Sequence, residues 1–259
     1  MLSSINDIYK YRSLIAALVG RHLSMRYRGS VLGFLWSFLN PLCLMLIYTL
    51  VFKYYIRFSG VPNYTIFVFC GLLPWIWTTS ALVESTASIA ASGHLITKSL
   101  FPAQILPLVA TLTNLINFLL ALPLLFIFMA FAGMQFHLSL VFLPILILLQ
   151  FLFLTALGTA AAAINVSFRD VQHLLGNVLT FVFFLCPIVY PASTVPEQWK
   201  FTMLLNPIAL LIQSYHQIVI EGAFPSLINF GYLLAWTALM LLISKMVYGK
   251  FSDRFAEML

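Results

Sequence analysis

The chain has 259 residues, of which 62% are hydrophobic and only 8% are charged, with a formal net charge of +6. A soluble domain carries about 25% charged residues, so this chain has too few to cover a water-facing surface. Because a helix needs about 20 apolar residues to cross a bilayer, the length leaves room for roughly six spans and for no soluble catalytic domain. The composition therefore predicts an all-α integral membrane protein with one transmembrane domain over residues 1–259.

The first thirty residues mix basic and apolar side chains. Apolar residues at positions 8, 11, 15, 18 and 19 fit one face of a helix, which predicts an amphipathic helix on the inner membrane surface. A basic topology anchor would explain the same residues, and the two interpretations are compatible.

Six apolar segments follow, and each is long enough to cross a membrane. We expect spans at residues 33–56, 64–83, 103–132, 138–166, 174–190 and 226–248. The fourth contains a run of small residues from Thr155 to Ala162, which favours close packing of helices. The intervening segment 191–225 is apolar but interrupted by prolines, so it is expected to form short re-entrant helices in the outer leaflet, buried against protein.

The distribution of basic residues predicts the orientation. With both termini in the cytoplasm, ten of the thirteen Lys and Arg residues lie inside, and Lys53, Arg57 and Lys200 lie outside. This is the bias expected of a multi-pass membrane protein. The positive charge therefore reflects topology and does not indicate nucleic-acid binding.

A polar segment, Glu84–Pro102, separates the second and third spans. It holds enough Ala, Ser, Leu and Ile for a short cytoplasmic helix, and Phe101-Pro102 directs the chain out of helix before the next span. We interpret the segment as a contact surface for a second protein that supplies energy. The alternative is a solvated loop with an inside-positive lysine.

The sequence shows no catalytic acid pair, catalytic triad or metal site. No ionisable residue is expected at membrane depth, which disfavours ion-coupled transport, and the neutral Asn114, Asn117 and Gln150 are typical of contacts between helices. The stretch from Gly93 to Ser99 lacks the second glycine of a phosphate-binding loop. Uphill transport would therefore need energy from a partner protein.

Three blocks of residues carry a family resemblance. They are Arg26-Tyr-Arg-Gly-Ser-Val-Leu-Gly-Phe-Leu-Trp-Ser-Phe-Leu-Asn-Pro41, Leu95-Ile-Thr-Lys-Ser-Leu-Phe-Pro102, and Phe168-Arg-Asp170 with the later Asn206-Pro207. In this order on six spans, they resemble the membrane subunit of type-two ABC exporters of polysaccharides, which handle O-antigen, capsule or teichoic acid. The resemblance covers essentially the whole chain.

The resemblance implies a homodimer in the bacterial inner membrane, bound to two copies of a separate ATPase that holds ATP and Mg. It implies no cofactor on this chain, and a substrate glycan, for which the O-antigen type is the first expectation, anchored to a polyprenyl diphosphate lipid. It also implies sites for coupling to the ATPase and for an outer gate. The coupling residues would be Ser88, His94, Lys98, Arg169 and Asp170, and the outer gate residues Tyr190, Glu197, Trp199 and Glu221.

Two further sets of residues have both a functional and an ordinary explanation. Arg21, Arg26 and Arg28 are suited to binding the lipid diphosphate, but attraction to anionic membrane lipids is the explanation that the sequence favours. An aromatic row on the first span suggests a surface along which a glycan slides, whereas an aromatic belt at the membrane interface is the alternative. The proposed pathway residues are Phe34, Phe38, Tyr48, Phe52 and Tyr55.

Two other functions stay open at the level of sequence. The same type of subunit could export another large amphiphile or a drug. A membrane enzyme or scaffold of glycolipid synthesis, without a transport role, is the alternative from a different class.

Overall fold

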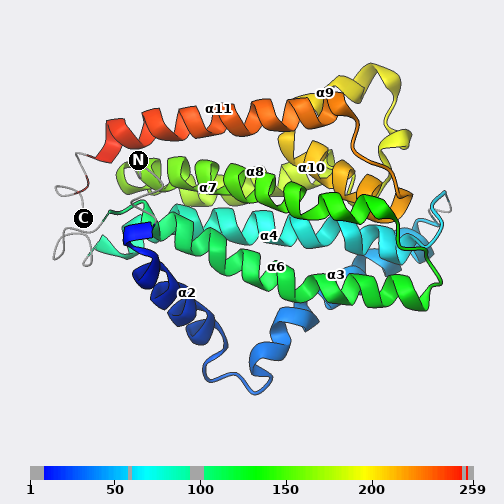
Figure 1. Ribbon diagram of the computed structural model, residues 1–259, viewed down its shortest axis with the longest axis horizontal. Coiled ribbons are helices and arrows are strands. Elements are labelled where there is room, and N and C mark those ends of the chain that lie inside the picture. Colours follow the sequence, from blue (N-terminus) through cyan, green and yellow to red (C-terminus); the bar gives the residue numbers. More distant parts are fainter. Residues whose placement is uncertain (1–8, 58–59, 94–101, 253–254, 256–259) are drawn as a thin grey trace.

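The computed structural model describes residues 9–57, 60–93, 102–252 and 255. This part of the chain is helical and contains no strand, as the sequence predicts for a membrane protein. Most of the helices run side by side along the long axis of the molecule, with α2 angled away from the others (Figure 1).

The helical elements follow one another with short connections. In chain order, the first four of the described α-helices are α2 (Arg12–Tyr27), α3 (Trp36–Thr49), α4 (Tyr64–Ala91) and α6 (Ile105–Phe131). The remaining α-helices are α7 (Leu143–Ser167), α8 (Val171–Leu185), α9 (Lys200–Leu205), α10 (Pro207–His216) and α11 (Leu227–Ser252). Short 3-10 or π segments are η1 (Gly33–Leu35), η2 (Leu50–Tyr55), η3 (Leu138–Phe142), η4 (Ala192–Thr194), η5 (Glu197–Trp199) and η6 (Gln217–Glu221).

Five helical segments of the described residues are long and apolar enough to cross a membrane. They are Gly33–Tyr55, Tyr64–Ala91, Ile105–Phe131, Leu138–Ser167 and Leu227–Ser252. These match five of the six expected spans. The fifth expected span, residues 174–190, differs because α8 has 15 residues and ends at Leu185. Cys186 is extended because it precedes Pro187, so α8 is about 22 Å long at ~1.5 Å per residue.

The chain between α8 and α11 contains a sharply bent pair of helices. The segments Glu197–Leu205 and Pro207–Glu221 meet at 104°, which is the geometry of a broken span or of a re-entrant loop. Asn206 makes the bend. It is extended before Pro207, and its side-chain oxygen accepts hydrogen bonds from the backbone N–H groups of Ile208 and Ala209.

The second span, α4, lies at the centre of the bundle. In its most apolar stretch 78% of the residues are buried, against 17% for the first and last spans, and it packs against α3, α6, α7, α8 and α10. It also continues to Ala91, beyond the boundary expected at Val83. The hydroxyl groups of Thr86 and Ser88 donate to the carbonyls of Leu82 and Ser85. These polar side chains therefore find hydrogen-bond acceptors within α4 itself.

Small residues set the distance between α4 and α7. A Cβ atom added to Gly158 would lie 2.7 Å from the Cβ of Ser85, closer than packed atoms allow. The expectation that the small residues of this span permit close helix packing is therefore confirmed at Gly158.

A buried amide joins α4, α7 and α10. The Nε2 of Gln150 donates to the carbonyl of Pro74 and to the hydroxyl of Thr78, both at 3.0 Å. Its Oε1 accepts a hydrogen bond from the Tyr215 hydroxyl at 2.8 Å. The prediction that Gln150 connects helices is confirmed.

We expect Gly158→Ala to destabilise the bundle by about 1–3 kcal/mol, because the new methyl group must push α7 away from Ser85. Unfolding of the purified protein in detergent with increasing SDS would measure the change. Gly231→Ala is the matched control, since Gly231 lies on α11 with no atom within 4 Å of an added Cβ. Equal losses of stability in the two variants would contradict close packing at Gly158.

Candidate functional site

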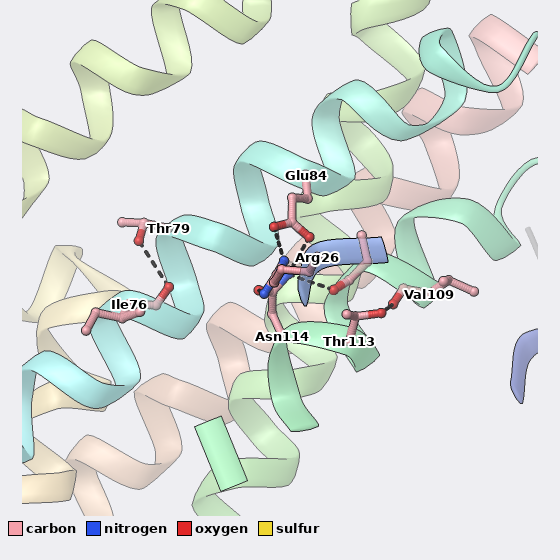
Figure 2. Close-up of polar contacts among 8 residues, drawn as sticks. Arg26, Ile76, Thr79, Glu84, Val109, Thr113 and Asn114 are labelled. Atoms are coloured by element: carbon pink, nitrogen blue, oxygen red, sulfur yellow. Dashed lines mark hydrogen bonds and ion pairs between the residues drawn. The ribbon is translucent and has the colours of Figure 1, made fainter. Parts of the chain in front are cut away.

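A ring of polar contacts joins α2, α4 and α6 (Figure 2). Arg26 forms an ion pair with Glu84 and donates from Nη1 to the Oδ1 of Asn114 at 3.2 Å. Asn114 in turn donates from Nδ2 to the second carboxylate oxygen of Glu84 at 2.8 Å. Each of the three side chains therefore contacts the other two, and we call this group the Arg26–Glu84–Asn114 triad.

Apolar packing places Arg26 over the bundle. Ile15 and Val19 on α2 are buried against Ile105, Leu108 and Val109 of α6, so the apolar face expected from the sequence packs partly against protein. This contact brings the last turn of α2, which carries Arg26, to α4 and α6. A basic residue in the last turn also suits the dipole of the helix.

The triad changes the interpretation of Glu84 and of Arg26. Glu84, the first residue of the segment expected to contact a second protein, is instead neutralised by Arg26. The two side chains are only 31% and 38% exposed, and Asn114 is 2% exposed. Among the described residues, Arg21 and Arg28 are exposed and form no ion pair. The three arginines proposed to bind a diphosphate are therefore not equivalent.

A cavity of about 410 Å³ lies beside the triad, between α3, α4 and α6. Its wall combines amide and hydroxyl groups with aromatic rings, and Trp77 stacks on Phe118 with ring centroids 5.0 Å apart. We call it the inner cavity. Its lining residues include Arg26, Trp36, Asn40, Trp77, Ser80, Asn114, Asn117 and Phe118.

The expected coupling residues within the described part of the chain lie at the end of α4 and in the turn between α7 and α8. Ser88 is half-buried on α4, and its hydroxyl donates to the carbonyl of Ser85 at 2.7 Å. Arg169 and Asp170 are exposed in the turn between α7 and α8. His94 and Lys98 lie outside the described residues.

Asn165, which the sequence did not mark as a candidate, links the end of α7 to the end of α4. Its Nδ2 donates to the carbonyl of Thr86 at 3.0 Å, which ties the end of α7 to the last turns of α4. Only its position three residues before Phe168-Arg169-Asp170 could have drawn attention to it.

The aromatic residues of the first span contact one another and a phenylalanine of α8. Phe34 and Phe38 pack edge to face at 5.4 Å, and Tyr48 lies 6.4 Å from Phe52. Tyr48 also lies 5.2 Å from Phe183 on α8, and both line a second cavity of about 370 Å³ between α3, α4 and α8. Tyr55, at the end of η2, is exposed.

The expected outer gate residues are spread over several elements. The Tyr190 hydroxyl donates to the carbonyl of Phe184 at 2.8 Å. Glu197 pairs with Lys200, and Trp199 is exposed and stacked on Phe201. Glu221 ends η6 and is exposed, and it has no hydrogen bond or ion pair to the other three within the described part of the chain.

The comparisons with known proteins identify the class to which this helical bundle belongs. The model of the ABC-2 type transporter membrane family matches residues 13–220. The chain therefore belongs to this family, as its sequence blocks suggested.

Relatives match the chain along nearly its whole length. It is 39% identical over 99% of both chains to the O-antigen export system permease protein RfbA of Myxococcus xanthus. It is 31% identical over 95% of both chains to a protein of that name from Klebsiella pneumoniae. It is 25% identical to the polysialic acid transport protein KpsM of Escherichia coli, over 90% of this chain and 92% of the relative.

Family membership decides between the two broad classes left open by the sequence. The chain is a permease subunit of an ABC-2 transporter and not an enzyme of glycolipid synthesis. The family also implies a separate ATPase as its partner.

We expect Arg26→Ala and Glu84→Ala each to destabilise the protein, because each leaves the other charge without its partner. The double variant should lose less than the sum of the two, with a coupling energy of about 0.5–3 kcal/mol. SDS titration of the four proteins of the cycle would measure it.

The matched control is the same cycle on Glu197 and Lys200, an ion pair of mostly exposed side chains. Its coupling should be close to zero. Additive effects at Arg26 and Glu84 would contradict a structural ion pair between α2 and α4.

Proposed function

We propose that two copies of this chain form the path along which a polysaccharide on a polyprenyl diphosphate lipid, most simply an O-antigen, leaves the cytoplasm. Two separate ATPase subunits, which bind ATP and Mg, would supply the energy. The observation that carries the proposal is family membership together with 39% identity, over the whole chain, to a permease of O-antigen export. Identity to the polysialic acid transporter is lower, at 25%.

The structure supports a coupling route at the cytoplasmic end of α4. This end carries Glu84, which is tied to α2 and α6, and Thr86, which is tied to α7 through Asn165. Force applied by an ATPase to the segment after Ala91 would therefore act on three neighbouring helices. His94 and Lys98 in that segment, and Arg169 and Asp170 in the adjacent turn, are the proposed contact residues.

A polar stripe on α8 supports a path between two subunits. His173, Asn177 and Thr180 follow helical spacing and are exposed in the single chain, beside the exposed Gly176. Polar side chains in a membrane face protein or water rather than lipid tails. Thr180 already donates to the carbonyl of Gly176, and a second copy or a water-filled path along α8 would satisfy His173 and Asn177.

The aromatic residues of the first span flank the same surface. Tyr48 contacts Phe183 of α8, which places part of the aromatic row beside the polar stripe. We propose that a glycan moves along this α3–α8 surface. Arg21 and Arg28, which are exposed, are then the cations most accessible to the lipid diphosphate.

The proposed setting is the bacterial inner membrane, with both termini in the cytoplasm. Ten of the thirteen basic residues then lie inside, in accordance with the positive-inside bias.

We expect this chain to co-purify with the ATPase encoded beside its gene and to raise ATP hydrolysis several-fold above that of the ATPase alone. Replacing His94 and Lys98 together by alanine should reduce both association and stimulation, because they lie on the proposed contact surface. Pull-down from nanodiscs followed by an ATPase assay measures both. A wild-type chain that captures no ATPase would exclude the proposed energy source.

We expect a cysteine at Asn177 to cross-link two copies of the chain through a flexible bis-maleimide. The background would lack the native Cys43, Cys70 and Cys186. Leu242→Cys, on an exposed part of α11, is the control that should remain monomeric on a denaturing gel. Cross-linking at α11 but not at α8 would contradict a path between two α8 helices.

A further inference from the structure

The last turns of α11 lie beside the parts of the chain where contact with an ATPase is proposed. The family match covers residues 13–220, so family membership assigns no role to α11. Yet α11 packs along α7, and residues at its C-terminus reach the ends of α4, α6 and α7. We call Tyr248 and Phe251 on α11, with Phe255 just beyond it, the α11 end.

Tyr248 holds the beginning of α6. It is 8% exposed, and its hydroxyl is hydrogen-bonded to the side chain and the backbone of Gln104, the residue directly before α6. Tyr248 and Phe255 pack edge to face at 5.6 Å, in one buried cluster with Ile89 of α4 and with the first turn of α6. The described parts of the chain on both sides of residues 94–101 therefore contact the α11 end.

Phe251 contacts the turn between α7 and α8. It follows Tyr248 by three positions, so the two side chains share one face of α11. The Phe251 ring lies 6.5 Å from that of Phe168, with the ring planes at 79°, an edge-to-face contact. Phe168 directly precedes Arg169 and Asp170, which are exposed in the turn. One turn of α11 therefore contacts both the beginning of α6 and the residue beside the proposed contact turn.

These contacts fix the helix ends relative to one another. Ala162 and Ala163 of α7 are fully buried in the same cluster as Tyr248, and such small side chains let α11 approach α7 closely. A binding surface made of separate pieces binds weakly when the partner must first bring the pieces into register, because that ordering costs free energy. Holding the pieces together beforehand removes this cost.

We propose that the α11 end holds the end of α4, the beginning of α6 and the α7–α8 turn together as one preformed surface for the ATPase, with Tyr248 and Phe251 as positioning residues. The two side chains act through the residues they contact and do not themselves touch the ATPase. The inference rests on the proposed function and adds to it residues, outside the family match, that set how tightly the ATPase binds.

The test uses the variant Tyr248→Phe with Phe251→Leu, which removes the hydroxyl and the ring contact but keeps both positions apolar. In nanodiscs, we expect this variant to bind the ATPase encoded beside the gene about five- to tenfold more weakly than the wild type does, because its contact surface is no longer preformed. Titration with labelled ATPase measures the affinity. ATP hydrolysis at saturating ATPase should stay near that of the wild-type complex, since the contact residues themselves are unchanged.

Tyr215→Phe with Phe230→Leu is the matched control. Tyr215 is buried and donates to Gln150, so the control also loses a hydrogen bond between a tyrosine and a glutamine. Phe230 lies edge to face with Phe142 at 5.4 Å, near the opposite end of α11 from Phe251. Both variants should unfold at lower SDS concentration than the wild type, but the control should bind the ATPase as tightly as the wild type does.

Two other results overturn the inference. Wild-type affinity in the Tyr248→Phe, Phe251→Leu variant would show that the ATPase surface does not depend on the α11 end. Equally weakened binding in the matched control would show that a general loss of stability is responsible. If the double variant does not fold, Tyr248→Phe alone, compared with Tyr215→Phe alone, provides the same test. A wild-type chain that captures no ATPase would instead contradict the proposed function itself.

Discussion

The requirement that α4 satisfy its polar groups without water fixes the arrangement of the bundle. α4 is surrounded by other helices over most of its length, and lipid offers no hydrogen bonds to replace those of water. The carbonyl of Pro74 accepts a hydrogen bond from Gln150 of α7, and the carbonyl of Thr86 accepts one from Asn165 of α7. The Glu84 carboxylate pairs with Arg26 and accepts a hydrogen bond from Asn114. Each of these contacts joins α4 to a neighbouring helix and helps to set the position of that helix.

The polar contacts are denser toward the end of α4 that leads into residues 92–102. Glu84, Ser85 and Thr86 are consecutive, and each bonds to a helix other than its own: Ser85 donates to the carbonyl of Pro107 on α6. In the middle of α4, by contrast, aromatic and aliphatic packing dominates, with Trp77, Phe69 and Leu72 almost fully buried. The bundle thus has a polar, directionally bonded end and a largely apolar middle, which the hydrogen bonds of Gln150 cross. A rigid connection at this end suits a subunit that must respond to a partner.

Much of this organisation could be predicted from the sequence. Composition and the length of the apolar runs predicted the helical membrane fold, and the small residues around Gly158 predicted close packing, since both depend on local sequence. The neutral amides were correctly interpreted as links between helices at Asn114 and Gln150. Their partners were not predictable, because Arg26 and Glu84 are separated by 58 positions and only the packing of α2 on α6 brings them together.

Two boundaries differed from the sequence prediction for opposite reasons. The residues after Val83 are polar enough to suggest a loop, yet their hydroxyl groups bond to carbonyls of the same helix and allow it to continue to Ala91. The residues up to Tyr190 are apolar enough to suggest a span, yet Pro187 ends α8 at Leu185. Hydropathy measures the preference of side chains for lipid, whereas these two boundaries depend on backbone hydrogen bonding.

The early end of α8 has a consequence for the membrane around it. At about 22 Å, α8 is shorter than the hydrocarbon core of a typical bilayer, which is about 30 Å thick. Hydrophobic mismatch of this kind is relieved when lipids thin locally or when protein covers the remaining depth. The bent pair α9–α10 lies at the end of α8, since Asn206 at its bend donates to the sulfur of Cys186. Where the lipids thin to match α8, a polar polymer moving along it would cross an apolar barrier about three quarters as thick as the undisturbed membrane.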